Sequence, residues 1–312
     1  MENKKIPVIA VVGPTASGKT SLAVELALQL DGQVISADSM QIFKNMPIAS
    51  AVPTLKERKG VEHYLLELLD GDDTFSVSDF VQKATELCFD ITKKGKIPIV
   101  AGGTGLYVDA LVNNLTFKDA APDMALRQKL EQEYDTLGGE AMLCRLGEID
   151  KVTAKRLHPN DKKRIVRAFE VYYSTGSTLS EQNEQSRQNP SPFEFLCIGI
   201  NYEDRQKLYD RINKRVDIML TQGLEAEARA AFDKNSKGTG TQAIGHKEFF
   251  EYFRGNQSLE QAVECIKMQT RRLAKRQITW FSAKPYVNWI MADCTDDVVQ
   301  KAMEIIKQNG WK

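Results

Sequence analysis

The sequence lacks the features that mark secreted, zinc-built or membrane proteins. Its 312 residues include five Cys and three His, and no two cysteines form a Cys-x-x-Cys pair. Scattered free thiols are typical of a reducing cytosol, and a structural zinc site is not expected. No run reaches the ~20 apolar residues of a membrane span. Lys plus Arg and Asp plus Glu balance at 42 each, which excludes a uniform field that attracts nucleic acid. We expect a soluble, cytoplasmic protein without a membrane partner.

The run from Gly13 to Thr20 reads GPTASGKT and fits the phosphate-binding pattern GxxxxGK[ST]. It follows an apolar run, which indicates a strand and not a signal peptide, and it precedes a helical pattern over 21–30. Gly13 and Gly18 let the backbone curl so that its N–H groups face one anion, and the helix N-terminus adds partial positive charge. Lys19 suits phosphate oxygens, and the Thr20 hydroxyl suits Mg²⁺. A ligand that carries a diphosphate is expected here.

Three apolar runs in the first third, at 7–12, 33–37 and 97–101, end in polar or glycine-rich loops and alternate with helical patterns. This alternation predicts a parallel α/β sheet with crossover helices. Two later runs, at 195–200 and 287–292, are further strand candidates. Ligands of such sheets bind beyond the carboxyl ends of the strands, so the loops that start at 13, 38 and 102 should share one edge.

The character of the chain changes between 117 and 192, where strand-like runs vanish and the pattern becomes charged and helical. Thr178 and Glu181 follow a glycine and predict a capping box at a helix start. The fold class we predict is therefore α/β, with a P-loop NTPase-like parallel sheet core and an inserted all-helical domain. The core, with C-terminal helices, would comprise 1–116 and 193–312, and the insertion 117–192.

Asp38 and Thr104 are the candidate chemical groups at the expected edge of the sheet. Asp38 closes the second apolar run, where it could cap a turn, bind Mg²⁺ through water or accept a proton. The third run leads into Gly102-Gly103-Thr104, without the Asp that completes the Mg²⁺ site of many P-loop kinases. A hydroxyl without an acid favours a site that stabilises a departing diphosphate over one that activates ATP.

Two segments are basic within this neutral chain. Seven Lys or Arg and one acid lie between Lys151 and Arg167, and five Lys or Arg with no acid lie between Lys267 and Arg276. Each alone could be a solvated face, but two beside a phosphate site favour a polyanion, of which RNA is the best candidate.

The pattern over 205–219 predicts a helix whose core residues are Leu208, Ile212 and Met219. Arg211 and Arg215 lie one turn apart on an adjacent face. They could pair with neighbouring aspartates or reach a diphosphate, and the pattern leaves both open.

Seven motifs follow one another along the chain. They are GPTASGKT at 13–20, DSMQIF at 38–43, GGTGLY at 102–107, HPNDKKRIVRAFEVY at 158–172, RINKRVDIM at 211–219, QAIGHKE at 242–248 and TRRLAKRQITWF at 270–281. In these motifs and their order the chain resembles the bacterial tRNA dimethylallyltransferases, also called tRNA isopentenyltransferases, along nearly its whole length.

This resemblance implies transfer of a dimethylallyl group from dimethylallyl diphosphate to N6 of the adenosine beside the tRNA anticodon, at position 37, with release of diphosphate. The P-loop would hold the diphosphate leaving group, with Mg²⁺ at Thr20. Asp38 would accept the N6 proton, and Thr104 and Lys19 would complete the catalytic set. The implied diphosphate ligands are Gly13, Thr15, Ala16, Ser17, Gly18, Lys19, Thr20 and Arg215.

The resemblance also implies a tRNA surface that binds the anticodon stem-loop, with the insertion as the domain that closes on it. The implied tRNA contacts are Asp38, Ser39, Met40, Gln41, Thr104, Arg127, Lys163, Arg164, Ile165, Val166, Arg167, Gln242, Gly245, His246 and Lys247. No assembly motif is apparent, so a monomer is expected. The chain departs from the family at 48–53, where Val52 replaces the usual lysine and removes one anion contact.

Three other functions fit parts of the pattern. A related adenylate isopentenyltransferase would act on free nucleotides, but the basic segments and the insertion favour tRNA. A P-loop kinase or NTPase is disfavoured because no acid follows Ala101. A non-catalytic RNA-binding module ranks last, because Lys19, Asp38 and Thr104 would have no function in it.

Overall fold

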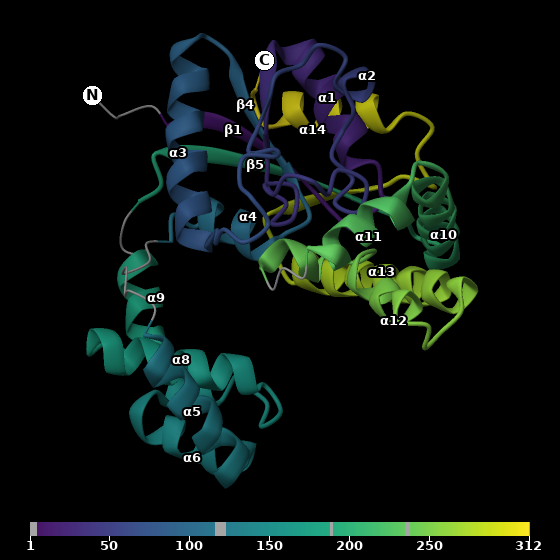
Figure 1. Ribbon diagram of the computed structural model, residues 1–312. Coiled ribbons are helices and arrows are strands. Elements are labelled where there is room, and N and C mark those ends of the chain that lie inside the picture. The colour runs from purple at the N-terminus through teal and green to yellow at the C-terminus, as the bar shows by residue number, and fades with distance from the viewer. Residues whose placement is uncertain (1–4, 116–122, 188–189, 235–237, 312) are drawn as a thin grey trace. The chain divides into compact units, whose positions relative to one another are not determined.

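The computed structural model describes residues 5–115, 123–187, 190–234 and 238–311. The chain forms two compact units, which we call the sheet unit (1–112 with 192–312) and the helical unit (113–191) (Figure 1). Residue 117, at which the sequence pattern placed the start of the insertion, lies outside the described residues.

The sheet unit is built on a parallel sheet of six strands in the order β3-β2-β4-β1-β5-β6. All five predicted strands are present. The two-residue strand β3, which pairs with β2 at the sheet edge, was not predicted. The strands are β1 (Ile6–Val12), β2 (Gly32–Ser36), β3 (His63–Tyr64), β4 (Ile97–Gly102), β5 (Phe193–Asn201) and β6 (Val287–Met291).

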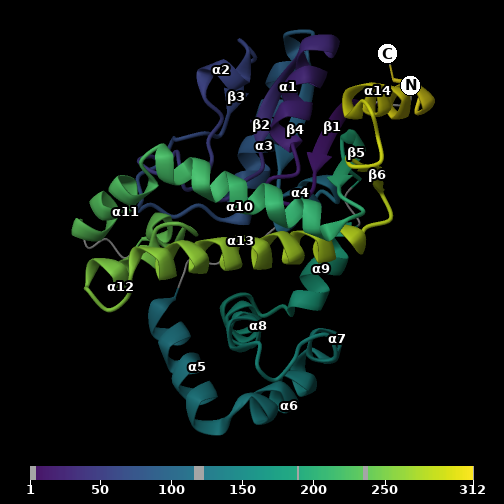
Figure 2. The ribbon, with the colours of Figure 1, turned by 90° about the vertical axis from the view of Figure 1, so that its right-hand side faces the viewer.

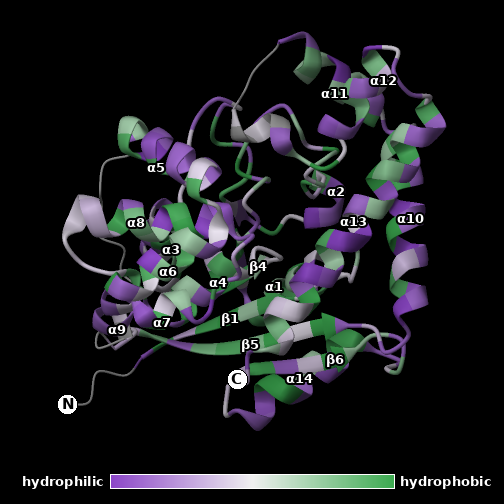
Figure 3. Ribbon diagram, turned by 90° about the horizontal axis from the view of Figure 1, so that it is seen from below, coloured by the Kyte–Doolittle hydropathy of each residue, from purple (hydrophilic) through white to green (hydrophobic). Residues whose placement is uncertain are grey.

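Helices cover both faces of the sheet, because successive side chains of a central strand point to opposite sides. Val8, Ala10 and Val12 of β1 pack in a core with α3 (Val77–Lys93) and α4 (Gly105–Val112). Ile9 and Val11 pack in a second core with α1 (Lys19–Leu30) and α14 (Val298–Gln308). Apolar residues therefore dominate the strands in Figure 3, whereas the covering helices are polar on their outer sides.

Two long helices of the sheet unit, α10 (Arg205–Thr221) and α13 (Leu259–Ser282), lie beside each other below the sheet in Figure 2. Leu208 and Ile212 of α10 pack with Ala274 of α13 and with Ala16 of the P-loop, so these helices support the loop directly. The predicted core residues Leu208, Ile212 and Met219 are all buried. The remaining elements of the unit are α2 (Leu55–Arg58), α11 (Leu224–Asp233), α12 (Phe250–Phe253) and the 3₁₀ turns η1 (Thr239–Gln242) and η2 (Lys247–Phe249).

The helical unit carries its own core. Leu130, Met142, Leu146, Ile165 and Phe169 pack together between its helices. The predicted capping box is present, since the Thr178 N–H donates to Glu181 Oε2 at 2.8 Å and the Glu181 N–H donates to Thr178 Oγ1 at 3.2 Å. The helices are α5 (Met124–Leu137), α6 (Gly139–Ile149), α7 (Lys151–Ala154), α8 (Lys162–Thr175) and α9 (Leu179–Arg187).

Across the described parts of both units, none of the helices combines the length and the apolar character that crossing a bilayer requires.

Candidate active site

Three loops meet at the carboxyl edge of β1, β2 and β4, as the strand order predicts. The backbone N–H of Ala37 donates to the Ala101 carbonyl at 2.8 Å, and the Thr104 N–H donates to the Ala37 carbonyl at 3.2 Å. A Cβ on Gly102 would lie 2.1 Å from that same Ala37 oxygen, so only glycine allows the approach. The loop after β2 and the turn after β4 are thereby held against each other.

The P-loop (Gly13–Thr20) uses its glycines as the motif predicts. Gly13 has φ 139° and lies against β5, where a Cβ would stand 2.3 Å from the Ile200 carbonyl oxygen. Gly18 caps α1 in the left-handed region at φ 102°. The first N–H groups of α1 have no partners within the helix, so the loop ends on free donors and the positive end of the helix dipole. This local geometry suits an anion.

Ser17 adds a polar side chain to the P-loop. Its side chain is almost fully buried, at 3% exposure, and its Oγ has no hydrogen-bond partner among the described residues. A buried hydroxyl without a partner is costly unless a ligand or water completes it. The Thr15 N–H, by contrast, is already used, since it donates to Oε1 of Gln277 on α13 at 2.8 Å.

Lys19 is half-buried, and its Nζ donates to the Pro14 carbonyl within the same loop at 2.6 Å. The pKa of Lys19 is lowered to about 8, chiefly by burial and also by nearby Arg215, while the Asp38 carboxylate acts in the opposite direction. An incoming anion would favour the charged ammonium and would compete with the Pro14 carbonyl for it.

Arg215 and Arg211 reach the P-loop region from α10. Burial lowers the pKa of Arg215, whereas the Glu57 and Asp38 carboxylates act in the opposite direction. Arg211 Nε donates to the Ala16 carbonyl at 3.0 Å, and its guanidinium lies 5.4 Å from the Tyr202 ring centroid. Arg211 therefore supports the loop, which leaves Arg215 as the arginine that faces the Lys19 and Asp38 charges.

Asp38 is half-buried at the end of β2. Burial raises its pKa, while N–H donation from Met40 and Gln41 and the charges of Lys19 and Arg215 hold the rise back. The Met40 N–H donates to Asp38 Oδ1 at 2.9 Å, which fixes the carboxylate orientation. A carboxylate with a raised pKa and a fixed orientation is suited to accept a proton.

Thr104 lies beside Asp38 through Ser39. The Ser39 N–H donates to Thr104 Oγ1 at 2.9 Å, and the two hydroxyl oxygens are 3.3 Å apart. The structure thus brings together the P-loop, Asp38, Thr104 and Arg215.

The Thr20 hydroxyl is the predicted metal ligand. Thr20 is exposed in the first turn of α1. No cluster of three or more His, Cys, Asp or Glu that could hold a metal occurs in the described residues. A single hydroxyl fits Mg²⁺, which binds through few protein ligands and keeps waters and phosphate oxygens for the rest.

The segment after Asp38 is clamped from two sides. Gln41 accepts from Ser36 Oγ at 2.7 Å and donates its Nε2 to the carbonyls of Ser50 and Ala51. On the other side, Glu227 of α11 accepts the N–H groups of Ile48 and Ala49 at 2.8 and 2.9 Å.

His246, predicted as a tRNA contact, belongs to this clamp. It is only 2% exposed, and its Nε2 lies 2.8 Å from Glu227 Oε1. Gly245 is also buried, whereas Gln242 and Lys247 are exposed. A direct contact of this segment with RNA would have to use Gln242 and Lys247, because the His246 side chain is turned into the protein.

In the helical unit, the predicted basic residues are exposed and the apolar ones are not. Ile165 and Val166 are 0% and 1% exposed, and their side chains are buried in the core of the unit. Lys163, Arg164 and Arg167 are exposed on α8.

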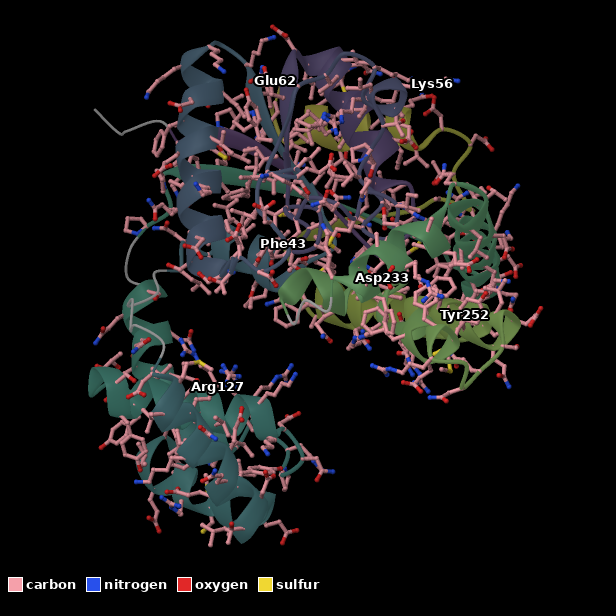
Figure 4. All side chains as sticks on the ribbon, in the orientation of Figure 1. Phe43, Lys56, Glu62, Arg127, Asp233 and Tyr252 are labelled. Atoms are coloured by element: carbon pink, nitrogen blue, oxygen red, sulfur yellow. The ribbon has the colours of Figure 1, made fainter. Side chains whose placement is uncertain are left out.

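Arg127, labelled in Figure 4, projects from α5, and its Nε lies 3.7 Å from Glu170 Oε1 on α8. Arg167 approaches the other oxygen of the same carboxylate at 3.4 Å. Glu170 thus holds two of the predicted RNA-contacting arginines together.

The fold and the site define the chain as a P-loop α/β protein with an anion cradle beside a half-buried carboxylate. The family model described as IPP transferase matches residues 41–284, and the one described as isopentenyl transferase matches residues 6–72. A tRNA dimethylallyltransferase of Acetivibrio thermocellus is 48% identical over 290 residues, 92% of each chain. The chain therefore belongs to the tRNA dimethylallyltransferase (IPP transferase) family.

Solved structures agree with this assignment. The full-length tRNA isopentenylpyrophosphate transferase of Bacillus halodurans is 40% identical with a TM-score of 0.72, and the match covers 98% of this chain and 96% of that one. A eukaryotic dimethylallyltransferase acting on tRNA is 27% identical with a TM-score of 0.82, over 98% of this chain and 80% of its own. These matches confirm the predicted fold class and family.

Proposed function

We propose that the chain transfers a dimethylallyl group from dimethylallyl diphosphate to N6 of the adenosine beside the anticodon of tRNA, giving N6-isopentenyladenosine and diphosphate. The observation that carries this is the placement of Asp38 and Thr104 at the same sheet edge as the P-loop, with Lys19 and Arg215 acting electrostatically on Asp38. Family membership supports the reaction class.

The P-loop takes the diphosphate of the donor. Its free N–H groups, Ser17 Oγ, Lys19 and Arg215 neutralise the charge that grows on the leaving oxygens as the allylic C–O bond breaks. Because an adenine amine is a weak nucleophile, this stabilisation is the largest contribution the site can make. The Thr20 hydroxyl would hold Mg²⁺, which when bound would supply further positive charge to those oxygens.

Asp38 acts on the acceptor. A new bond forms between N6 and the allylic carbon, the electron pair of the C–O bond leaves with the diphosphate, and the N6 proton passes to the Asp38 carboxylate. Thr104 is hydrogen-bonded to Ser39, the residue that follows Asp38. Its hydroxyl therefore lies near the Asp38 carboxylate, where it orients the N6 amine. The adenosine reaches it only after leaving its stack, which costs a few kcal/mol.

RNA binding rests on the exposed cations. Lys163, Arg164 and Arg167 in the helical unit and Arg272, Lys275 and Arg276 in the sheet unit are exposed, and such side chains suit phosphate oxygens. The proposed partner is the tRNA anticodon stem-loop. The proposed setting is the cytoplasm, with the chain acting as a monomer.

Nucleoside analysis tests this function. The chain is incubated with labelled dimethylallyl diphosphate, Mg²⁺ and unmodified tRNA, and the digested tRNA should contain labelled N6-isopentenyladenosine. Parallel reactions offer AMP as the acceptor or ATP alone. Transfer to AMP without transfer to tRNA would favour the adenylate enzyme, and ATP turnover without prenyl transfer would favour a kinase or NTPase.

A further inference from the structure

Gln277 connects two loops of the candidate active site through one side chain. Its Oε1 accepts the N–H of Thr15 in the P-loop at 2.8 Å, and its Nε2 donates to the carbonyl of Gly103 after β4 at 3.0 Å. Gln277 comes from α13, 262 residues along the chain from Thr15 and 174 from Gly103. The side chain therefore acts as a tertiary bridge and not as part of any local turn.

The bridge is buried and demands an amide. Gln277 is 9% exposed, and one partner is a donor while the other is an acceptor, so a single orientation of the amide satisfies both. A Cβ at position 103 would stand 2.2 Å from the Gln277 Nε2 atom. The glycine at this position therefore leaves room for the Gln277 side chain. Neither an apolar side chain nor a carboxylate can make both bonds.

Each of the two loops that Gln277 joins carries a residue that contacts one of the two substrates in the proposed reaction. The P-loop carries Lys19, which faces the leaving diphosphate. The turn continues from Gly103 to Thr104, whose Oγ1 accepts the Ser39 N–H next to Asp38. Two hydrogen bonds of Gln277, the peptide bond from Gly103 to Thr104 and the Ser39–Thr104 hydrogen bond therefore connect the P-loop to the residues beside Asp38.

We propose that Gln277 is a positioning residue that sets the separation between the diphosphate cradle and the acceptor residues Asp38 and Thr104. This inference rests on the proposed function and deepens it. A transfer between two bound substrates depends on their relative placement, and an error of about 1 Å can lower the rate by about 100-fold. The P-loop has other support, since Arg211 holds the Ala16 carbonyl and β5 packs on Gly13. Loss of the bridge should therefore alter the spacing without removing the cradle.

Gln277→Met keeps the length of the side chain and removes both hydrogen bonds. We expect the single-turnover rate at saturating tRNA and dimethylallyl diphosphate to fall about 10- to 100-fold. The Kd values for inorganic pyrophosphate and for tRNA should stay within about 3-fold of wild type, because Gln277 is buried and is not among the proposed contacts of either ligand. The control is Gln261→Glu, an exposed capping residue at the start of the same helix, which should keep the wild-type rate.

Gln277→Glu gives a signature that a purely structural role would not give. The ionised carboxylate repels the Gly103 carbonyl, but the protonated acid can accept from Thr15 and donate to Gly103 as the amide does. Its burial favours the protonated form. The rate of this variant divided by the wild-type rate should therefore rise at least about 3-fold from about pH 8 to about pH 6. Asp38 and Lys19 are present in both proteins and Arg215 stays charged in both, so their contributions cancel in the ratio.

Melting temperatures of both variants establish that the protein is folded at each pH. The proposal is overturned if folded Gln277→Met turns over within about 3-fold of wild type at saturating concentrations of both substrates. A pH-independent ratio for Gln277→Glu overturns it equally. Absence of prenyl transfer in the wild-type protein would instead overturn the proposed function, so the two failures are distinct.

Discussion

Asp38 and Lys19 act on each other's charge although they follow different strands. Asp38 raises the pKa of Lys19 against its burial, and Lys19 lowers the pKa of Asp38 against its own burial. β2 and β1 are both neighbours of β4, so the loops that follow them reach one edge of the sheet. The pairing puts a proton acceptor beside the proposed leaving-group site, and several predictions depend on it.

The first prediction concerns pH. Asp38 must be ionised to accept a proton, and its pKa is raised, so kcat/KM should fall with decreasing pH at values above the ordinary Asp range. Lys19 must be charged to hold the diphosphate, so kcat/KM should also fall as pH rises past its pKa of about 8. In Lys19→Arg the residual activity should lose the alkaline limb, because a guanidinium keeps its charge. An alkaline limb that persists in Lys19→Arg would assign it to another group.

The second prediction concerns the donor. Arg215→Ala should raise the KM for dimethylallyl diphosphate about 10- to 100-fold, which corresponds to one lost charge-assisted contact. Burial of Arg215 beside the Asp38 charge is the reason. Initial rates over a range of donor concentration measure this. The exposed Lys307→Ala on α14 is the control, and an unchanged KM in Arg215→Ala would remove the arginine from the diphosphate site.

The third prediction concerns tRNA. Replacing Lys163 and Arg167 by Ala should weaken tRNA binding and reduce the slope of log Kd against log salt by about 1.5, since each phosphate contact contributes about 0.7 to 0.9. Titrations at several salt concentrations give the slope. The same slope in variant and wild type would mean that this part of α8 is only a solvated face.

The fourth prediction concerns the clamp on 48–49. Glu227→Ala leaves two backbone N–H groups and His246 without their acceptor, so the free energy of unfolding should fall by about 1–3 kcal/mol. Combining it with His246→Ala should give less than the sum of the two effects, by at least about 0.5 kcal/mol. Urea unfolding measures both. Glu264→Ala, an exposed ion-pair partner, should change stability by less than about 1 kcal/mol. Full additivity would contradict a direct coupling of Glu227 and His246.

The strands and the P-loop could be predicted because their signals are local. An apolar run followed by GPTASGKT can be recognised without knowledge of any tertiary contact. The topology of parallel sheets then predicts that the loops after neighbouring strands lie at one edge. Strand β3 escaped prediction because two residues are too short for a periodicity. Phe43, labelled in Figure 4, is buried in the main core although it lies in a turn segment, which the pattern of the strands does not reveal.

The tertiary bridges could not be predicted. Gln277 and Glu227 are ordinary polar residues of helices, and their partners come from distant segments. His246 attracted an RNA-binding prediction because it lies in a family motif, but its ring points to Glu227. The burial of Ile165 and Val166 could have been predicted, because together with Phe169 they follow the apolar spacing of a buried helix face. Val52 is half-buried, and nothing in the structure explains the replacement of the family lysine.

The chemical role of Asp38 is tested most directly by Asp38→Asn in a single-turnover reaction with labelled dimethylallyl diphosphate and excess enzyme over tRNA. The amide keeps the size of the side chain but cannot take the N6 proton, so the rate should fall about 100- to 10,000-fold while the Kd for tRNA changes little. A variant that binds tRNA normally and prenylates it within about 3-fold of the wild-type rate would contradict the account.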